Sequence, residues 1–186
     1  ILLYSDKERA LELLKISLPV FEKYAKCEKR KIDCKAEIVF VKYLLYNNSY
    51  DELYILQKNA YDNKFMHVYA RITLILLTLE LIDSENTNSI EARLTKLLIE
   101  YNDLNGINRL GLFTNQLFTA IYYKEGNYQK QCVYAKKQQM IAEKLSKEYL
   151  EVPLHNQLRL ESNKIVWKYK GKQTDDNGLW LDPKVW

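Results

Sequence analysis

The stretch from Leu117 to Leu145 constrains the fold of this chain most strongly, because it holds two helical patterns with one break between them. The first pattern repeats apolar side chains at the spacing of one helical face, at Leu117, Phe118, Ile121 and Tyr122. The second apolar face is made by Tyr128, Cys132, Val133, Ala135, Met140, Ile141 and Leu145. Between them stands Gly126, and glycine reaches the left-handed conformation that closes a helix without steric cost. The stretch therefore predicts a hairpin of two antiparallel helices.

This hairpin resembles a tetratricopeptide repeat. The match covers the end of that motif's first helix, its turn and the start of its second helix. The residues that stand in this order and spacing are Tyr122, Tyr123, Lys124, Gly126, Asn127 and Tyr128. The resemblance implies an all-α fold in which antiparallel hairpins stack as a right-handed superhelix. It also implies a concave side, lined by the first helix of each hairpin, that binds a peptide or a partner helix.

Internal repetition supports the same fold class. Tyr50, Ser89 and Tyr128 are equally spaced along the chain, and each is a suitable helix start. Their spacing, on the order of 40 residues, resembles that of the lengthened tetratricopeptide repeats, with HEAT-like repeats and an irregular helical bundle as the alternatives. The positions predicted to pack closely against the preceding helix in this register are Leu53, Ala92 and Gln131.

Composition favours long helices, since the 186 residues include only five Gly and three Pro. The predicted helices cover about 5–26, 32–46, 50–61, 64–82 and 89–102, both arms of the hairpin, and about 153–170. We interpret residues 1–170 as one helical repeat domain and the chain, which begins without Met, as a fragment of a longer protein. The tail 171–186 contains two Trp and is predicted either to cap the last helix or to dock onto a partner.

The reactive side chains form no catalytic or metal-binding motif. Cys27, Cys34 and Cys132 have no CxxC spacing, which indicates reduced, packed thiols in a cytosolic protein. His67 and His155 lack a companion at ligand spacing. No HExxH, GxSxG or phosphate-binding glycine sequence occurs, so we expect neither an enzyme nor a bound metal or cofactor. The net charge of +4 is too mild for a nucleic-acid interface, and the most apolar run, 72–82, is too short to cross a membrane.

The concave-side positions of the repeat family, carried onto this chain, give the candidate binding residues. They are Lys35, Lys42, Tyr46, Arg71, Gln116 and Tyr123. Lys35 and Lys42 lie two helical turns apart on one face, where they suit a peptide carboxylate or acidic side chains. Replacing both with Glu is expected to abolish ligand binding and leave stability nearly unchanged. Ordinary surface lysines and packed tyrosines are the alternative interpretation.

Together these patterns indicate a non-catalytic, cytoplasmic module that binds a peptide or protein in a groove. The Lys-, Asn-, Tyr- and Ile-rich composition indicates an AT-rich genome of the bacterial kind. In that setting the fold resembles the sensor domains of peptide-responsive bacterial regulators, which implies a role in transcription regulation with a separate DNA-binding domain. Two alternatives stay open: a scaffold or oligomerisation segment that forms a homodimer, and an accessory helical domain of a larger signalling enzyme.

Overall fold

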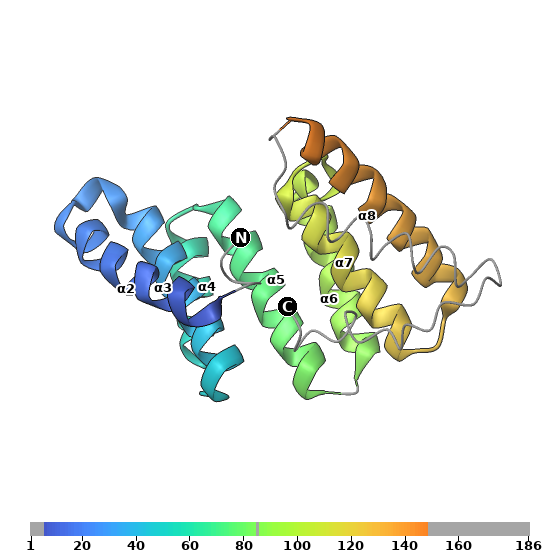
Figure 1. Ribbon diagram of the computed structural model, residues 1–186, viewed down its shortest axis with the longest axis horizontal. Helices are drawn as coiled ribbons and strands as arrows, with labels where there is room; N and C mark the ends of the chain where they lie inside the picture. Colours follow the sequence, from blue (N-terminus) through green and yellow to red (C-terminus); the bar gives the residue numbers. More distant parts are fainter. Residues whose placement is uncertain (1–5, 85, 149–186) are drawn as a thin grey trace. The chain divides into compact units, whose positions relative to one another are not determined.

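The computed structural model describes residues 6–84 and 86–148, and within these ranges every regular element is helical (Figure 1). The α-helices are α2 (Lys7–Lys23), α3 (Glu28–Tyr46), α4 (Glu52–Asp62), α5 (Met66–Asp83), α6 (Thr87–Glu100), α7 (Arg109–Lys124) and α8 (Tyr128–Glu148). Two short 3-10 helices lie in the connections, η1 (Ala25–Cys27) and η2 (Asn102–Asn105). The predicted all-α class is confirmed. The helix expected over about 153–170 and the tail 171–186 lie outside the described residues.

Polar side chains fix where two of these helices begin. Asn108 Oδ1 accepts a hydrogen bond from the Gly111 amide at 2.9 Å, and Asn86 Oδ1 accepts one from the Ser89 amide at 3.3 Å. Each side chain satisfies a backbone donor of the first turn that has no partner within its helix. Because Asn86 is the cap, α6 begins at Thr87, and the start predicted at Ser89 is two positions late.

The predicted break at Gly126 is confirmed. Gly126 has φ +68°, the left-handed conformation, and a Cβ there would meet no atom within 4 Å. The Gly126 amide donates to the Tyr123 carbonyl at 3.0 Å, and the Asn127 amide donates to the Tyr122 carbonyl at 2.9 Å. These bonds satisfy the last carbonyl groups of α7 and turn the chain into α8.

The chain divides into two compact units, and the boundary between Leu76 and Leu77 falls inside α5. In the unit up to Leu76, α2 packs along α3. Their shared core has four buried members, Leu11, Cys34, Ile38 and Val41, with Leu14, Leu18, Phe21 and Leu45 partly buried around them.

In the part of the chain that the structure describes, no helix combines the length and the apolar character needed to cross a membrane.

In the unit from Leu77, α6, α7 and α8 lie side by side in that order (Figure 1). The middle helix is buried on nearly all sides, since every residue from 110 to 122 except Phe113 is buried. At one end of the α7–α8 pair, Leu112 packs with Ile141, Ala142 and Leu145. A helix with partners on both sides needs such an all-round interior composition, and α7 provides it.

A close backbone approach fixes the start of α7. An added Cβ on Gly111 would lie 2.1 Å from the Gly106 carbonyl oxygen, so only glycine fits at this position. Gly106 follows η2, and the Asn108 side chain bonds back to the Asp103 carbonyl at 2.8 Å. The loop between α6 and α7 is therefore tightly packed against the first turn of α7.

The prediction that Ala92 of α6 packs against the preceding helix is wrong. Its buried residues are Thr87, Ile90, Leu94 and Leu97. Ala92 lies about 200° around the helix axis from Ile90 and is exposed. The other two positions of the same register, Leu53 and Gln131, are buried as expected. The repeat register therefore fails at α6, because Ile90, Leu94 and Leu97 set the buried face and Ala92 lies opposite to it.

Candidate functional site

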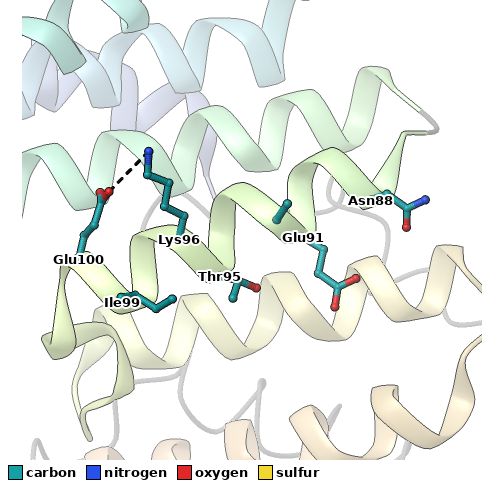
Figure 2. A pocket seen from close by; sticks show the side chains of 7 residues that line it. Asn88, Glu91, Thr95, Lys96, Ile99 and Glu100 are labelled. Atoms are coloured by element: carbon teal, nitrogen blue, oxygen red, sulfur yellow. Dashed lines mark ion pairs between the residues drawn. The ribbon is translucent and has the colours of Figure 1, made fainter.

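A shallow, open depression of about 530 Å³ lies along the solvent side of α6. Its lining residues are spaced as one helical face, at Asn88, Glu91, Ala92, Thr95, Lys96, Ile99 and Glu100. Figure 2 shows these seven side chains, all of them from α6. We call this surface the α6 hollow. Its volume falls within the range of about 300–1,000 Å³ that is usual for ligand sites.

The floor of the α6 hollow is made by small side chains. Ala92 and Thr95 stand one turn apart and leave room for another chain to approach the helix closely. At one end Ile99 is 80% exposed, which makes it the most exposed large apolar side chain among the described residues. Beside it Lys96 Nζ and Glu100 Oε1 form an ion pair at 3.7 Å (Figure 2). The hollow thus combines a small floor, one apolar end and charged edges.

Glu91, at the opposite end, is held by the neighbouring helices. The Tyr122 hydroxyl of α7 donates a hydrogen bond to Glu91 Oε1, and Lys130 Nζ of α8 lies 3.6 Å from the same oxygen. Burial and the neighbouring carboxylate raise the pKa of Tyr122, so its hydroxyl keeps its proton. Glu91 is therefore a fixed acceptor at the edge of the hollow.

Tyr122 also belongs to an aromatic cluster between α7 and α8. The Phe118 and Tyr134 rings stack with centroids 4.5 Å apart, and Tyr122 lies 5.4 Å from Tyr134. Lys130 stands 4.7 Å from the Tyr122 centroid and Lys137 stands 4.8 Å from the Tyr134 centroid. Stacked rings and cations over ring faces both stabilise such contacts. The cluster joins α7 to α8, and Tyr122 extends it to α6.

Two further contacts tie α6 and α7 to the end of α5. Arg93 of α6 forms an ion pair with Glu80 of α5. Lys124 of α7 donates to the Leu81 carbonyl at 2.5 Å and to the Ser84 carbonyl at 3.3 Å. A cation at the carbonyl end of a helix is favourable because the helix dipole is negative there. These contacts hold the helix that carries the hollow in place.

Three of the predicted binding residues, Lys35, Lys42 and Tyr46, lie on α3. Lys35 and Lys42 share one face of the helix, as expected, and both are half-buried. Lys35 Nζ stands 3.3 Å from Glu22 Oε1 of α2, which partly neutralises its charge. Tyr46 is the last residue of the helix and is 58% exposed. That these residues bind a ligand stays a prediction.

Arg71, on α5, joins a different side of α3. Its guanidinium donates to Asp33 Oδ2 at 2.7 Å and to Glu37 Oε1 at 2.5 Å. These two carboxylates lie about 140–180° around the α3 axis from Lys35 and Lys42. Burial raises the pKa of Glu37, and the guanidinium of Arg71 opposes that rise. The structure therefore does not bring Arg71 together with the two lysines.

The last two predicted residues, Gln116 and Tyr123, lie on α7 in the unit from Leu77. Gln116 is 1% exposed, and its Oε1 atom has no hydrogen-bond partner among the described residues. Tyr123 is half-buried next to the Gly126 turn. Neither residue lines the α6 hollow. Sequence reasoning did not predict the hollow. The available signal was the presence of small residues at 92 and 95, together with Ile99, on the face of the helix opposite its apolar core positions.

The three cysteines of the described residues are free thiols. Cys34 and Cys132 are buried, and Cys27 is half-buried. Burial and the nearby carboxylates raise the pKa of Cys34, so this thiol resists ionisation. Among the described side chains, no cluster of three or more His, Cys, Asp or Glu could hold a metal ion.

Comparison with known proteins adds no relative to this description: no family model, curated protein or solved structure matches the chain. The geometry of the described residues is therefore the basis for a functional proposal.

Proposed function

We propose that this chain is a non-catalytic interaction module that binds a segment of a peptide or protein in the α6 hollow. The observation that carries the proposal is the exposed face of α6 itself. Most exposed helix faces carry long polar side chains, but this one presents Ala92 and Thr95 beside an Ile99 that is 80% exposed. A single exposed isoleucine is ordinary by itself, but beside small side chains in a hollow it offers a docked peptide both room and an apolar contact.

The chemistry of the hollow selects its occupant. Its three charged lining residues are Glu91, Lys96 and Glu100. Lys96 pairs with Glu100, and Lys130 of α8 lies 3.6 Å from Glu91, so both carboxylates already have a cationic partner. The fitting occupant is therefore an amphipathic peptide that places apolar side chains over Ala92 and Ile99 and polar side chains over the paired charges.

The wider proposal follows the resemblance to tetratricopeptide repeats. In it, the antiparallel hairpins stack as a right-handed superhelix, and the module is the cytoplasmic sensor domain of a bacterial transcription regulator. What supports this is the series of helices and the Gly126 turn. The regulator assignment rests on the family resemblance alone.

Selection of binding peptides tests the proposal. A displayed library of random peptides is selected against the wild-type chain, and the affinities of the recovered peptides are then measured by titration calorimetry for three variants. Ile99→Glu and Ala92→Arg are expected to weaken binding at least about tenfold, because they place a charge and a bulky side chain in the hollow. Ile55→Glu is the matched control, since Ile55 is 70% exposed on α4.

The same peptides separate the α6 hollow from the surface predicted on α3. If the hollow is the site, the Lys35→Glu and Lys42→Glu double variant keeps its affinity for the selected peptides. Acidic peptides that lose affinity for that double variant, and keep it for Ile99→Glu, would place the site on α3 instead. Such a result would contradict the assignment to α6.

A further inference from the structure

Helix α2 has a second apolar face that points to solvent. Leu13, Ile16 and Val20 recur at i, i+3 and i+7, and Tyr24 follows directly after the helix. Their exposed fractions are 38%, 66%, 54% and 54%. We call these four residues the α2 ridge. Four large apolar side chains in one line form a patch, whereas single exposed ones are ordinary.

The α2 ridge is not part of the core that α2 forms with α3. That core uses Ala10 and Leu11, which are 6% and 3% exposed, with the partly buried Leu14 and Leu18 behind them. At about 100° per residue, Ile16 lies about 160–200° around the helix from Leu14 and Leu18. Helix α2 therefore has one face for its own core and another that the described residues leave open to solvent.

Opposite charges flank the two ends of the ridge, so the ridges of two antiparallel copies are complementary in charge. Glu12 stands before Ile16 and Lys23 stands after Val20, and both charged residues are exposed. Because they are eleven positions apart, they lie within about 20° of each other around the helix axis. Glu12 also pairs with Arg9 at 2.7 Å, but both side chains are more than half exposed, so water screens that pair.

We propose that the α2 ridge docks against the α2 ridge of a second copy of this chain, with the two helices antiparallel. In this arrangement Ile16 of one copy faces Val20 of the other. Glu12 then stands level with Lys23 of the second copy, and the two-fold axis creates the same pair twice. A parallel arrangement would place like charges opposite each other, which disfavours it.

The expected dimer is weak and concentration-dependent. One face of a 17-residue helix covers much less than the roughly 800 Å² per partner of a standard interface. The ridge shares no residue with the α6 hollow, so this inference is independent of the proposed peptide binding.

Sedimentation equilibrium of the full chain over a wide concentration range tests the dimer. The wild-type chain is expected to show a monomer–dimer equilibrium. Ile16→Glu is expected to weaken it at least about tenfold, because a charge is buried at the centre of the ridge. Ile55→Glu, which changes a similarly exposed isoleucine on α4, is expected to leave the equilibrium unchanged. Circular dichroism checks that each variant keeps its helices.

Charge reversal tests the register without changing the apolar ridge. Glu12→Lys alone sets Lys against Lys23 of the second copy, and Lys23→Glu alone sets Glu against Glu12. Each variant is expected to dimerise less than the wild type. In a heterodimer of the two variants, the unchanged Glu12 of one copy meets the unchanged Lys23 of the other. The two substituted side chains, which carry opposite charges, meet at the second pair. Heterodimers in an equimolar mixture are therefore expected to form as strongly as the wild-type dimer.

Three results would overturn the proposal. The first is a folded wild-type chain that stays monomeric at every concentration, as it would if another segment of the chain covered the ridge. The second is a dimer that Ile16→Glu leaves intact, which would place the interface elsewhere. The third is a mixture of the two charge variants that associates no better than either variant alone.

Discussion

The two units of this chain are built from similar helical hairpins, but different interactions link their helices. In the unit up to Leu76, a long-range ionic contact joins α3 to α5, with Arg71 between Asp33 and Glu37. In the unit from Leu77, aromatic stacking joins α7 to α8, with Phe118 on Tyr134. An ion cluster thus links helices in one unit, and ring packing links them in the other.

Their solvent faces differ as well. Helix α2 presents large side chains in a ridge, whereas α6 presents small side chains in a hollow. Both helices bury one apolar face in their own unit, so burial alone does not explain the difference. It follows that the buried face of a helix sets the fold, while the size of the residues on the opposite face sets what kind of partner can dock.

The largest expected effect is on the buried face of α6. Leu94 is 0% exposed, so Leu94→Ala is expected to lower the free energy of unfolding by about 2–5 kcal/mol through lost apolar burial and a cavity. Thr95→Ala, the neighbouring residue on the solvent face, is the control and should change it by less than about 0.5 kcal/mol. Urea denaturation followed by circular dichroism measures both. Equal effects would mean that the two faces of α6 are not distinct.

A smaller effect is expected where the aromatic cluster meets α6. Tyr122→Phe keeps the ring but removes the hydroxyl that donates to Glu91, and it is expected to cost about 1–2 kcal/mol of unfolding free energy. Tyr134→Phe keeps the stacking and is expected to cost less. The same denaturation experiment compares the two variants. A larger loss for Tyr134→Phe would show that the hydroxyl contact with Glu91 is not what links the cluster to α6.

The ionic unit is expected to respond to pH through Glu37. Burial raises the pKa of Glu37 above its ordinary value of 4.5, so the folded state holds this proton more tightly than the unfolded state. The stability that this group contributes is present below pH 4.5 and is lost as the pH rises through the folded pKa. Glu37→Gln removes that loss. Its unfolding free energy relative to the wild type is therefore expected to rise as the pH increases above 4.5.

Thermal unfolding at several pH values measures this difference. Glu52→Gln changes an exposed glutamate of α4 and serves as the control. Parallel pH profiles for the wild type and Glu37→Gln would contradict the role given to the buried carboxylate.

The smallest effect on stability is expected at the floor of the α6 hollow. Ala92 lies on the solvent side, so Ala92→Arg should change the unfolding free energy by less than about 0.5 kcal/mol while it fills the hollow. Denaturation beside a peptide-binding assay separates the two effects. If Ala92→Arg lowered the unfolding free energy by several kcal/mol, the repeat register predicted from sequence, in which Ala92 packs against another helix, would be correct after all.

The fold class and the helices could be predicted from sequence because the signals are local. Apolar spacing and the turn at Gly126 act within a few residues, and the structure confirms both. The start of α6 was harder to place because Asn86 and Asn88 are both suitable caps. The repeat register assigned Ala92 to the core, whereas the apolar spacing of Ile90, Leu94 and Leu97 sets the buried face on the opposite side.

The contacts that define the sites could not be predicted in this way. Arg71 meets Asp33 and Glu37 across 38 and 34 residues of sequence, and Tyr122 meets Glu91 across 31 residues. No local pattern specifies such pairs, because they depend on how helices distant in sequence pack. The family resemblance predicted Arg71 and Gln116 at a groove. In the structure Arg71 is paired with Asp33 and Glu37, and Gln116 is buried.

Amide chemical-shift mapping is the direct test of peptide binding in the α6 hollow. A peptide recovered from the library is titrated into the isotope-labelled chain, and the backbone amide shifts are followed by NMR. We predict that the largest shifts fall on residues 88–100 of α6 and are absent in Ile99→Glu. Shifts centred instead on Lys35, Lys42 and Tyr46 of α3, with α6 unchanged, would contradict the proposed site.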